Sequence, residues 1–434
     1  MHGYALRGGA SVTRFFYSLV LYALLPVVVL RLLWRSRRAP AYRRRWPERF
    51  GFVPPLTGSR VIWVHSVSVG ETLAAVPMVR RLLADFPDHQ LVVTTMTPTG
   101  SECVRAAFGD RVYHVYAPYD LPDAVRRFLD RVNPELMVVM ETELWPNCIA
   151  ICDRRDIPVI VANARLSARS AAGYRRFAPL VRPMLKGLSQ VAAQTVDDGQ
   201  RFIDLGLERS QLAVTGNIKF DLTISPGQRR RASELSARWR GPDERPVLLA
   251  ASTHRGEDEI VLDAFEQLLE HFPSLLLVLV PRHPERFGEV WELIRGRGLS
   301  AIRRSDGQVP AASDQVVLGD TMGELALFCG ACDIVFVGGS LVPVGGHNLI
   351  EPAAWGVPVL SGPELFNFTE VARLLTEADA LAICRTAPEL SREVGQLLAD
   401  DERRRERGRR ALGVAEANRG AMERLLTLIG QRVR

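Results

Sequence analysis

The sequence predicts an α/β protein with two domains, each a doubly wound parallel sheet covered by helices. Short apolar runs without clear alternation are separated by amphipathic helical stretches, a pattern typical of parallel strands buried on both faces. This alternation occurs twice, on either side of a polar stretch near Ser225–Trp239 that contains Pro226, Gly227 and three consecutive arginines. The length of 434 residues suits two domains with attachments.

Twelve apolar runs are the expected strands. The first series is Val61–Val64, Leu91–Thr94, Val112–Tyr116, Leu136–Met140, Val159–Ala162, Val191–Ala193 and Leu212–Thr215. The second series is Val247–Ala250, Leu275–Val280, Gln315–Leu318, Ile334–Val337 and Val357–Leu360. Because open α/β sheets bind ligands outside the carboxyl ends of their strands, we expect ligands in a cleft between two facing domains.

The domain boundaries follow from these series. We expect an N-terminal membrane-anchor helix with a basic flank at 1–40, a first Rossmann-like domain at 41–225, an interdomain linker at 226–244, a second Rossmann-like domain at 245–410, and a C-terminal helix at 411–434. Apolar residues at helical spacing in this last segment could pack back on the first domain.

The segment Phe15–Leu30 is uncharged and apolar, and as a helix its sixteen residues would span about 24 Å. The arginines that follow it are Arg31, Arg35, Arg37, Arg38, Arg43, Arg44, Arg45 and Arg49. Charge after the apolar run is the wrong order for a secretory signal peptide and the right order for a body retained in the cytoplasm. These arginines could also hold anionic lipid headgroups. A buried N-terminal helix is the alternative.

The charge distribution argues against a nucleic-acid-binding protein. Residues 1–49 carry a net charge of +9, whereas the remainder carries −3, so the body lacks a basic footprint. Six cysteines are scattered along the chain, and the pair Cys329 and Cys332 has no second pair nearby. We therefore expect free thiols and no metal site.

A glycine-rich stretch follows the strand at Ile334–Val337. It contains Gly338-Gly339-Ser340 and Gly345-Gly346, and a helix is expected to begin near Leu349. Glycines allow close approach of the backbone to a ligand, and helix starts attract phosphate. Glu351 could accept hydrogen bonds from ribose hydroxyls. The arrangement looks like the donor-nucleotide site of a glycosyltransferase.

Carboxylates and a lysine follow strands of the first series. Glu71 lies in the first turn of a helix after His65, where the helix terminus should favour the ionised form of a general base. Glu141 and Glu143 follow the strand at Leu136, and Lys219 is one of only two lysines in the chain. The alternative for these acids is helix capping, and for the lysine chance retention.

Polar residues also follow strands of the second series. They are Ala251-Ser252-Thr253-His254, Pro281-Arg282-His283-Pro284 and Asp320-Thr321-Met322-Gly323-Glu324. Their hydroxyls, backbone N–H groups and cation suit a nucleotide monophosphate. The chain contains no Walker-type or G-x-G-x-x-G fingerprint, which weakens kinase and dehydrogenase interpretations.

The sequence closely resembles the 3-deoxy-D-manno-octulosonic acid (Kdo) transferase family of lipopolysaccharide assembly. The segments that carry the resemblance are RRAPAYRRRW, HSVSVGETLAA, TTMTPTGSE, YAPYDLPDA, METELWPN, ANARLSARSAAGY, ASTHRGE, VPRHPERF, GDTMGEL and FVGGSLVPVGGHN. The resemblance implies a GT-B fold, with an acceptor-binding first domain and a donor-binding second domain. It also implies CMP-Kdo as donor, a lipid A precursor as acceptor, and an inner-membrane location with the catalytic domains on the cytoplasmic side.

Residue roles carry over from the family position by position. Glu71 corresponds to the general base, and Glu141 and Lys219 to positions that assist the transition state. The CMP-binding positions are Pro281, Arg282, Met322, Gly323, Glu324, Asn348, Leu349, Ile350 and Glu351. Family members often have a proline in the segment that reads His347-Asn348-Leu349-Ile350-Glu351 here, a change that affects only local loop geometry.

The implied reaction is a single displacement that inverts the anomeric centre and needs no metal or other cofactor. Two alternatives remain from the sequence. One is a GT-B transferase with another donor, such as a UDP-sugar. The other is a membrane-tethered binding or scaffold protein that has kept a transferase shell. The combination of Glu71, Glu141, Lys219 and Glu351 argues against an inactive shell.

Overall fold

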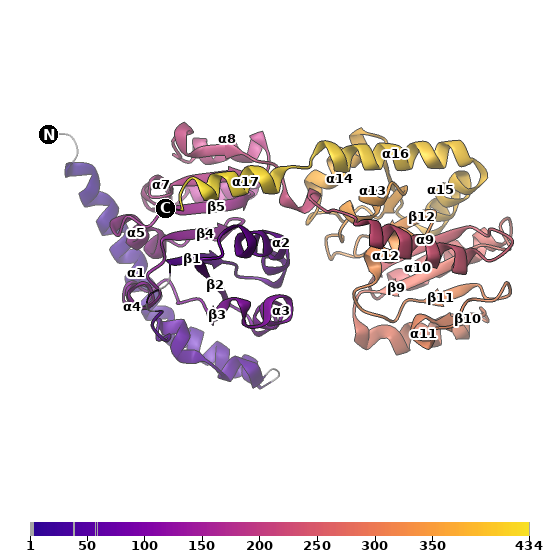
Figure 1. Ribbon diagram of the computed structural model, residues 1–434, viewed down its shortest axis with the longest axis horizontal. Coiled ribbons are helices and arrows are strands. Elements are labelled where there is room, and N and C mark those ends of the chain that lie inside the picture. Colours follow the sequence, from indigo (N-terminus) through magenta and orange to yellow (C-terminus); the bar gives the residue numbers. More distant parts are fainter. Residues whose placement is uncertain (1–3, 38–39, 57, 59, 434) are drawn as a thin grey trace. The chain divides into compact units, whose positions relative to one another are not determined.

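The computed structural model describes residues 4–37, 40–56, 58 and 60–433. The chain forms two compact units: Met1–Asp221 together with Arg419–Arg434, and Leu222–Asn418 (Figure 1). Each unit contains one seven-stranded sheet in which every pair of neighbouring strands is parallel. The predicted α/β class with two doubly wound sheets is confirmed.

The first sheet has the strand order β3-β2-β1-β4-β5-β6-β7. Its strands are β1 (Arg60–His65), β2 (His89–Thr95), β3 (Tyr113–Tyr116), β4 (Leu136–Met140), β5 (Val159–Ala164), β6 (Gln190–Ala193) and β7 (Leu212–Val214). All seven runs predicted for this domain are strands. Successive side chains of β1 point to opposite faces, so Trp63 joins one apolar core and Ile62 and Val64 join the other.

Helices cover both faces of the first sheet. They are α2 (Val69–Asp85), α3 (Pro98–Phe108), α4 (Pro122–Val132), α5 (Pro146–Arg154), α6 (Ala168–Arg175), α7 (Ala178–Lys186) and α8 (Val196–Asp204). Short 3₁₀ helices are η1 (Pro40–Arg43), η2 (Trp46–Phe50), η3 (Gly109–Arg111), η4 (Arg209–Gln211) and η5 (Ile218–Phe220). Several helices begin with a side-chain cap, such as Ser68 on α2 and Thr195 on α8.

The second sheet has the order β10-β11-β9-β8-β12-β13-β14. Its strands are β8 (Val247–Thr253), β9 (Leu276–Pro281), β10 (Ala301–Arg303), β11 (Val316–Leu318), β12 (Ile334–Val337), β13 (Val359–Ser361) and β14 (Leu381–Ile383). The five predicted strands are present. Strands β10 and β14, both three-residue edge strands, were not predicted from the sequence. Strand β10 is only partly buried, and β14 is apolar but too short to be told from a buried helix segment.

The helices of the second unit include the stretch expected to be a linker. They are α9 (Pro226–Arg240), α10 (Glu257–Leu269), α11 (Phe287–Gly296), α12 (Leu325–Cys329), α13 (Ile350–Trp355), α14 (Thr369–Glu377), α15 (Ala387–Ala399) and α16 (Asp401–Ala417), with 3₁₀ helices η6 (Pro284–Arg286) and η7 (Arg304–Asp306). Helix α9 is polar in sequence, but its Trp239 is buried and its ring centroid lies 5.3 Å from that of Phe328. Residues 226–240 are therefore an integral helix of the second unit.

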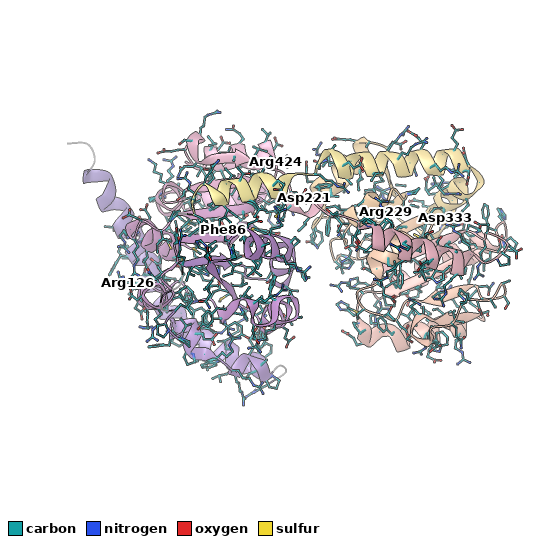
Figure 2. All side chains as sticks on the ribbon, in the orientation of Figure 1. Phe86, Arg126, Asp221, Arg229, Asp333 and Arg424 are labelled. Atoms are coloured by element: carbon teal, nitrogen blue, oxygen red, sulfur yellow. The ribbon has the colours of Figure 1, made fainter. Side chains whose placement is uncertain are left out.

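The C-terminal segment divides between the units. Helix α16 belongs to the second unit, whereas α17 (Ala421–Gly430) belongs to the first and buries Leu425 and Ile429 in its core. The Asp221 carboxylate accepts hydrogen bonds from the N–H groups of Gly420 and Met422, and so caps the start of α17 (Figure 2). The packing of a C-terminal helix on the first domain is as the apolar spacing indicated.

The N-terminal helix α1 (Tyr4–Ser36) is longer than the apolar run that predicted it. Its stretch Val12–Ser36 is long and apolar enough to cross a membrane. Part of the helix also contacts the first unit. The Tyr17 hydroxyl donates to Asp120 at 2.9 Å, Ser18 bonds to Asn147, and Tyr22 bonds to Asp123. The helix also leaves apolar side chains such as Phe15 and Leu30 about two-thirds exposed.

Only part of the arginine cluster after this helix is exposed. The Arg45 guanidinium pairs with Glu48 at 2.7 Å and donates to the carbonyl of His114. Arg49 is 2% exposed and lies over the Tyr116 ring at 4.2 Å. These two arginines are structural, whereas Arg31, Arg35, Arg37, Arg43 and Arg44 are exposed and Arg38 lies outside the described residues.

A close helix contact in the second unit gives a test of the fold. A Cβ atom added at Gly408 of α16 would lie 2.1 Å from the carbonyl oxygen of Gly356, which follows α13. Gly408→Ala should therefore destabilise the unit by about 1–3 kcal/mol. Gly413, in the same helix, has no heavy atom within 4 Å of such a Cβ. Gly413→Ala should stabilise by about 0.5–1 kcal/mol. Thermal melting of both variants measures the difference, and a loss of stability in both would contradict the contact.

Candidate active site

The acidic residues of the first unit lie at the point where the strand order reverses. Strands β1 and β4 are neighbours, and the crossovers from them run in opposite directions along the sheet. Such a switch point leaves a crevice at the carboxyl ends of the strands. Glu71 comes from the first turn of α2, directly after β1, and Glu141 follows the last residue of β4. Two predicted catalytic residues thus come from adjacent strand ends.

Glu71 forms a capping box at the start of α2. Its carboxylate accepts hydrogen bonds from the Val67 N–H at 2.8 Å, the Ser68 N–H at 3.3 Å and the Ser68 hydroxyl at 2.7 Å, while Ser68 caps the Glu71 N–H. The side chain is thereby held in one orientation. The capping alternative seen in the sequence is real, and it positions the carboxylate rather than excluding a chemical role.

The protonation of Glu71 differs from the sequence-based expectation. Burial raises the pKa of Glu71 above its ordinary value, and it outweighs the hydrogen bonds from Ser68 and Val67 that favour the ionised form. The nearby carboxylates Glu143 and Glu141 raise this pKa further. The helix terminus does favour the ionised form, as expected, but the sequence could not show the burial that outweighs it. A carboxylate with a raised pKa is a stronger base than an ordinary one.

Lys219 faces this acidic cluster. Its Nζ atom lies 3.6 Å from Oε1 of Glu141, so the structure brings together two of the predicted catalytic residues. The 3₁₀ turn that carries Lys219 is fixed by Asn163 at the end of β5, whose Oδ1 accepts from the Ile218 N–H at 3.1 Å. Glu141 and Asn163 both have positive φ, near 55°. Non-glycine residues in this region are uncommon and often mark functional sites.

Glu143 is a further carboxylate of this cluster, and it was assigned no separate role from the sequence. Burial raises its pKa, against a hydrogen bond from the Trp145 indole, and Glu141 raises it further. His65, at the end of β1, is 1% exposed, and burial lowers its pKa to about 3. Its Nδ1 bonds to the Thr94 hydroxyl at 2.9 Å. His65 is therefore a neutral part of the core.

The second sheet has its switch point between β8 and β12. One buried carboxylate joins the loops that follow these strands. Glu257, at the start of α10, is 0% exposed and accepts four backbone hydrogen bonds. The donors are the N–H groups of His254 at 2.9 Å, Gly339 at 2.6 Å, Ser340 at 2.8 Å and Leu341 at 2.8 Å. The shape of the glycine-rich loop after β12 therefore depends on Glu257.

Histidines line the same loops. The Nε2 atoms of His254 and His347 lie 2.8 Å apart with the rings nearly parallel, and the His283 ring stands at right angles to that of His254. Burial lowers the pKa of His254 and lowers that of His347 to about 4, so both rings are neutral and share one N–H. Gly339 has φ of 68°, and a Cβ there would lie 2.8 Å from the His347 ring.

The predicted CMP-binding residues occupy three strand ends of this sheet. Pro281 is the buried last residue of β9, and the exposed Arg282 follows it. Met322 is 63% exposed after β11, and Gly323 has φ of 83°. Glu324 is already paired with Arg304 at 2.8 Å. Burial opposes ionisation of Glu324, but hydrogen bonds from Arg304 and Thr321 outweigh it and lower its pKa.

The segment Asn348–Glu351 is only partly accessible. Leu349 and Ile350 are 0% exposed, so their side chains serve the core and only their backbone is available to a ligand. Asn348 accepts from the Ile350 N–H and donates to Glu351 Oε1 at 3.1 Å. Burial raises the pKa of Glu351, although the bond from Asn348 lowers it. Helix α13 has only six residues, which limits its dipole.

The sequence missed Glu257 and the histidine pair. A signal for Glu257 was present, because Gly256-Glu257 follows β8 as Gly70-Glu71 follows β1. The two glutamates differ in the segments to which they are hydrogen-bonded. Glu71 accepts hydrogen bonds within its own loop, whereas Glu257 joins two loops about 80 residues apart in the chain. Only the three-dimensional structure shows this second arrangement.

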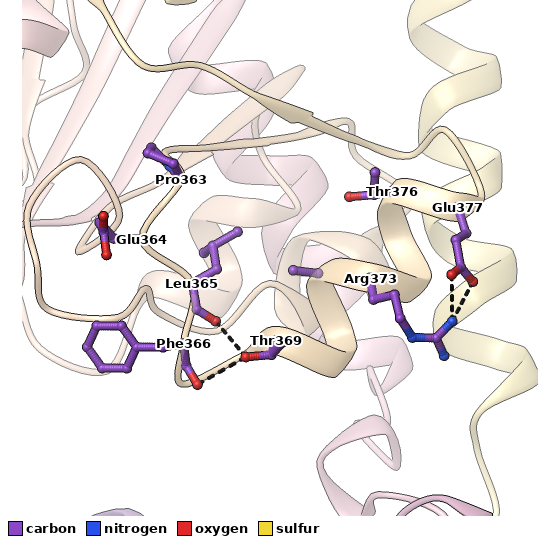
Figure 3. A pocket seen from close by; sticks show the side chains of 9 residues that line it. Pro363, Glu364, Leu365, Phe366, Thr369, Arg373, Thr376 and Glu377 are labelled. Atoms are coloured by element: carbon purple, nitrogen blue, oxygen red, sulfur yellow. Dashed lines mark hydrogen bonds and ion pairs between the residues drawn. The ribbon is translucent and has the colours of Figure 1, made fainter. Parts of the chain in front are cut away.

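A pocket of about 580 Å³ in the second unit contains none of the predicted site residues (Figure 3). It is lined by the segment 363–366 and by α14, with an ion pair between Arg373 and Glu377 at its rim. Next to this lining in sequence, the Asn367 N–H donates a hydrogen bond to the carbonyl of Gly345 in the glycine-rich loop at 3.0 Å. The pocket therefore lies beside a segment that contacts the glycine-rich loop, and it is not the predicted nucleotide site.

Comparison with known proteins decides the family. Residues 44–222 match the family model described as 3-deoxy-D-manno-octulosonic-acid transferase (kdotransferase). The 3-deoxy-D-manno-octulosonic acid transferase of Haemophilus influenzae is 46% identical over 422 residues, 96% of this chain and 98% of that protein. The chain belongs to the Kdo transferase family. The Bordetella pertussis member is 37% identical, over 94% of this chain and 97% of its own length.

A more distant solved structure supports the fold of this family member. The crystal structure of a glycosyltransferase from Rickettsia africae has a TM-score of 0.55 and 13% identity, and covers 87% of this chain and 99% of its own. The GT-B class implied by the sequence is confirmed at the level of two parallel-sheet domains. As a Kdo transferase family member the chain is a glycosyltransferase, which removes the scaffold alternative.

Proposed function

We propose that the protein transfers Kdo from CMP-Kdo to a lipid A precursor, with inversion at the anomeric carbon, in the synthesis of the lipopolysaccharide inner core. Membership of the Kdo transferase family supports the transferred sugar and the acceptor class. The observation that carries the mechanism is the cluster of Glu71, Glu141 and Lys219 at the switch point of the first sheet.

In this mechanism Glu71 acts as general base. A hydroxyl oxygen of the acceptor forms a bond to the anomeric carbon of Kdo, and its proton passes to the Glu71 carboxylate. The bond between that carbon and the phosphate oxygen breaks, and CMP leaves with the electron pair. Lys219, placed by Glu141, offers a compact cation for the negative charge of the reacting sugar carboxylate or phosphate. Direct displacement inverts the anomeric centre.

The loops of the second unit would bind CMP. Arg282 is exposed at the end of β9 and offers a guanidinium fork to the phosphate. Glycines 338, 339, 345 and 346 leave four positions of the loop after β12 without side chains, and Glu257 fixes part of its backbone. Asn348 and Glu351 supply amide and carboxylate groups for ribose hydroxyls. Met322 and Gly323 line the neighbouring strand end.

Ligand-dependent thermal stability tests the donor. CMP should raise the melting temperature of the purified protein, and at a hundredfold excess over the dissociation constant the gain is about 2.7 kcal/mol. UDP at the same concentration should give little change. Equal stabilisation by UDP would favour the UDP-sugar alternative. Mass spectrometry of the product from CMP-Kdo and a lipid A precursor then tests transfer itself.

We further propose that α1 holds the enzyme at the inner membrane, with the catalytic domains on the cytoplasmic side. Tyr17, Ser18 and Tyr22 lie in the N-terminal half of the apolar segment, yet they bond to polar residues elsewhere in the first unit. A helix held in this way would lie along the membrane surface with its apolar side inserted. The exposed Phe15 and Leu30 would enter the lipid.

A further inference from the structure

A pocket within the first unit, lined by α1, α4 and α5, contains three arginines. Its volume is about 380 Å³, and Arg14 of α1, Arg126 of α4 and Arg154 of α5 line it. Arg126 is labelled on the ribbon in Figure 2. Arg14 lies within electrostatic range of both other guanidiniums. Three like charges from three different helices around one hollow repel one another unless an anion lies between them.

Asp120 and Asp153 interact with Arg14, but they offset only part of the positive charge of this pocket. None of its lining residues is acidic. Asp120 is buried behind it and already accepts hydrogen bonds from the Tyr17 hydroxyl and the N–H groups of Asn147 and Cys148. Asp153 is exposed and lies outside the lining. Across residues 4–37, 40–56, 58 and 60–433, no carboxylate oxygen lies within 4.0 Å of the Arg14, Arg126 or Arg154 guanidinium.

The pocket also opens on apolar surface. Phe15 and Leu19 belong to its lining and are 64% and 54% exposed. Ser18 and Asn147 add polar groups at the wall, where they bond to each other. An occupant that fits has a phosphate for the guanidiniums and hydrocarbon for the face of α1. A free anion would contact the guanidiniums but not the apolar face of α1.

We propose that this pocket binds the phosphate headgroup of an anionic phospholipid, with an acyl chain along the exposed face of α1. The site is separate from the arginines that follow the helix, and it requires no donor or acceptor sugar. An experiment can therefore refute lipid binding at this pocket without refuting the proposed glycosyl transfer, and an experiment that refutes the transfer leaves the lipid proposal intact. Arginine suits the role because its fork matches phosphate geometry.

Vesicle partition of the full-length protein tests the proposal. The probes are vesicles of phosphatidylcholine alone and of phosphatidylcholine mixed with phosphatidylglycerol. The wild type should prefer the mixed vesicles. The variant Arg14→Gln/Arg126→Gln/Arg154→Gln should lose at least about fivefold of that preference, since each basic group near an anionic surface contributes about that factor. Its partition into phosphatidylcholine should stay unchanged, because the apolar face of α1 is intact.

A matched control removes the same charge elsewhere in the first unit. Arg80, Arg105 and Arg209 are exposed, and Arg80→Gln/Arg105→Gln/Arg209→Gln should keep the preference. Arg126→Gln alone, at an exposed position, should lower it by about threefold to fivefold and keeps the test valid if the triple variant misfolds. Equal losses in both triple variants, or no loss in Arg126→Gln, overturn the proposal. So does inorganic phosphate that abolishes the preference at constant ionic strength, because the occupant is then a free anion.

Discussion

Glu257→Gln is expected to abolish CMP binding and to destabilise the second unit by about 2–6 kcal/mol, the cost of two buried N–H groups without acceptors. Oε1 of Glu257 accepts from Ser340 and Leu341, and Oε2 accepts from His254 and Gly339. An amide at this position can serve only one of these pairs, and its NH₂ group would face the donors of the other. The loops after β8 and β12 would then lose their shared support.

Two measurements on this variant separate folding from binding. Thermal melting reports the loss of stability, and calorimetric titration with CMP below the melting temperature reports the loss of the nucleotide site. The exposed Glu270, just beyond α10, gives the control: Glu270→Gln should stay within about 0.5 kcal/mol of the wild type and keep its CMP affinity. Wild-type CMP affinity in Glu257→Gln would show that the glycine-rich loop holds its shape without this carboxylate.

The fold was largely predictable from the sequence because central parallel strands are continuous apolar runs. Val61–Val64 and Ile334–Val337 are fully buried, and their composition alone marks them as strands. The edge strands β10 and β14 were not predicted, because β10 is only partly buried and β14, although apolar, is too short to be told from a buried helix segment. A linker was also predicted where α9 forms. This helix buries only Ala232, Leu235 and Trp239, and most of its residues are polar, so the stretch does not resemble a buried helix.

The candidate site was predictable only where residues lie directly at strand ends. Glu141 and Lys219 were recognised by type and place, and the structure pairs them. The raised pKa of Glu71 was not predicted, because the sequence shows that this residue lies at a helix terminus but shows neither its burial nor its acidic neighbours. The bonds from Glu257 to Gly339 and Ser340 join segments far apart in the chain, so no local pattern contains them.

Glu71→Gln is expected to lower the turnover rate by about 10²–10⁴-fold, the usual contribution of a general base. Glutamine can still form the capping box through its amide oxygen, so α2 should keep its start, but the N–H group of either Val67 or Ser68 loses its acceptor and stability should fall by about 1–3 kcal/mol. CMP affinity should also stay close to the wild-type value. Turnover measured at a temperature where the variant remains folded separates the proposed base from a merely structural carboxylate, whose replacement would lower stability and leave turnover intact.

The pH dependence of the reaction sharpens this test. A base acts only when ionised, so the rate should fall as the pH drops through the pKa of Glu71. Burial raises that pKa above the ordinary value of 4.5, and the acidic limb of the profile should lie correspondingly higher. The carboxylates Glu143 and Glu141 raise it as well, so Glu143→Gln should move the limb to lower pH while it retains activity. If Glu143→Gln instead removes turnover and Glu71→Gln does not, the base is Glu143, and the capping box of Glu71 is its whole role.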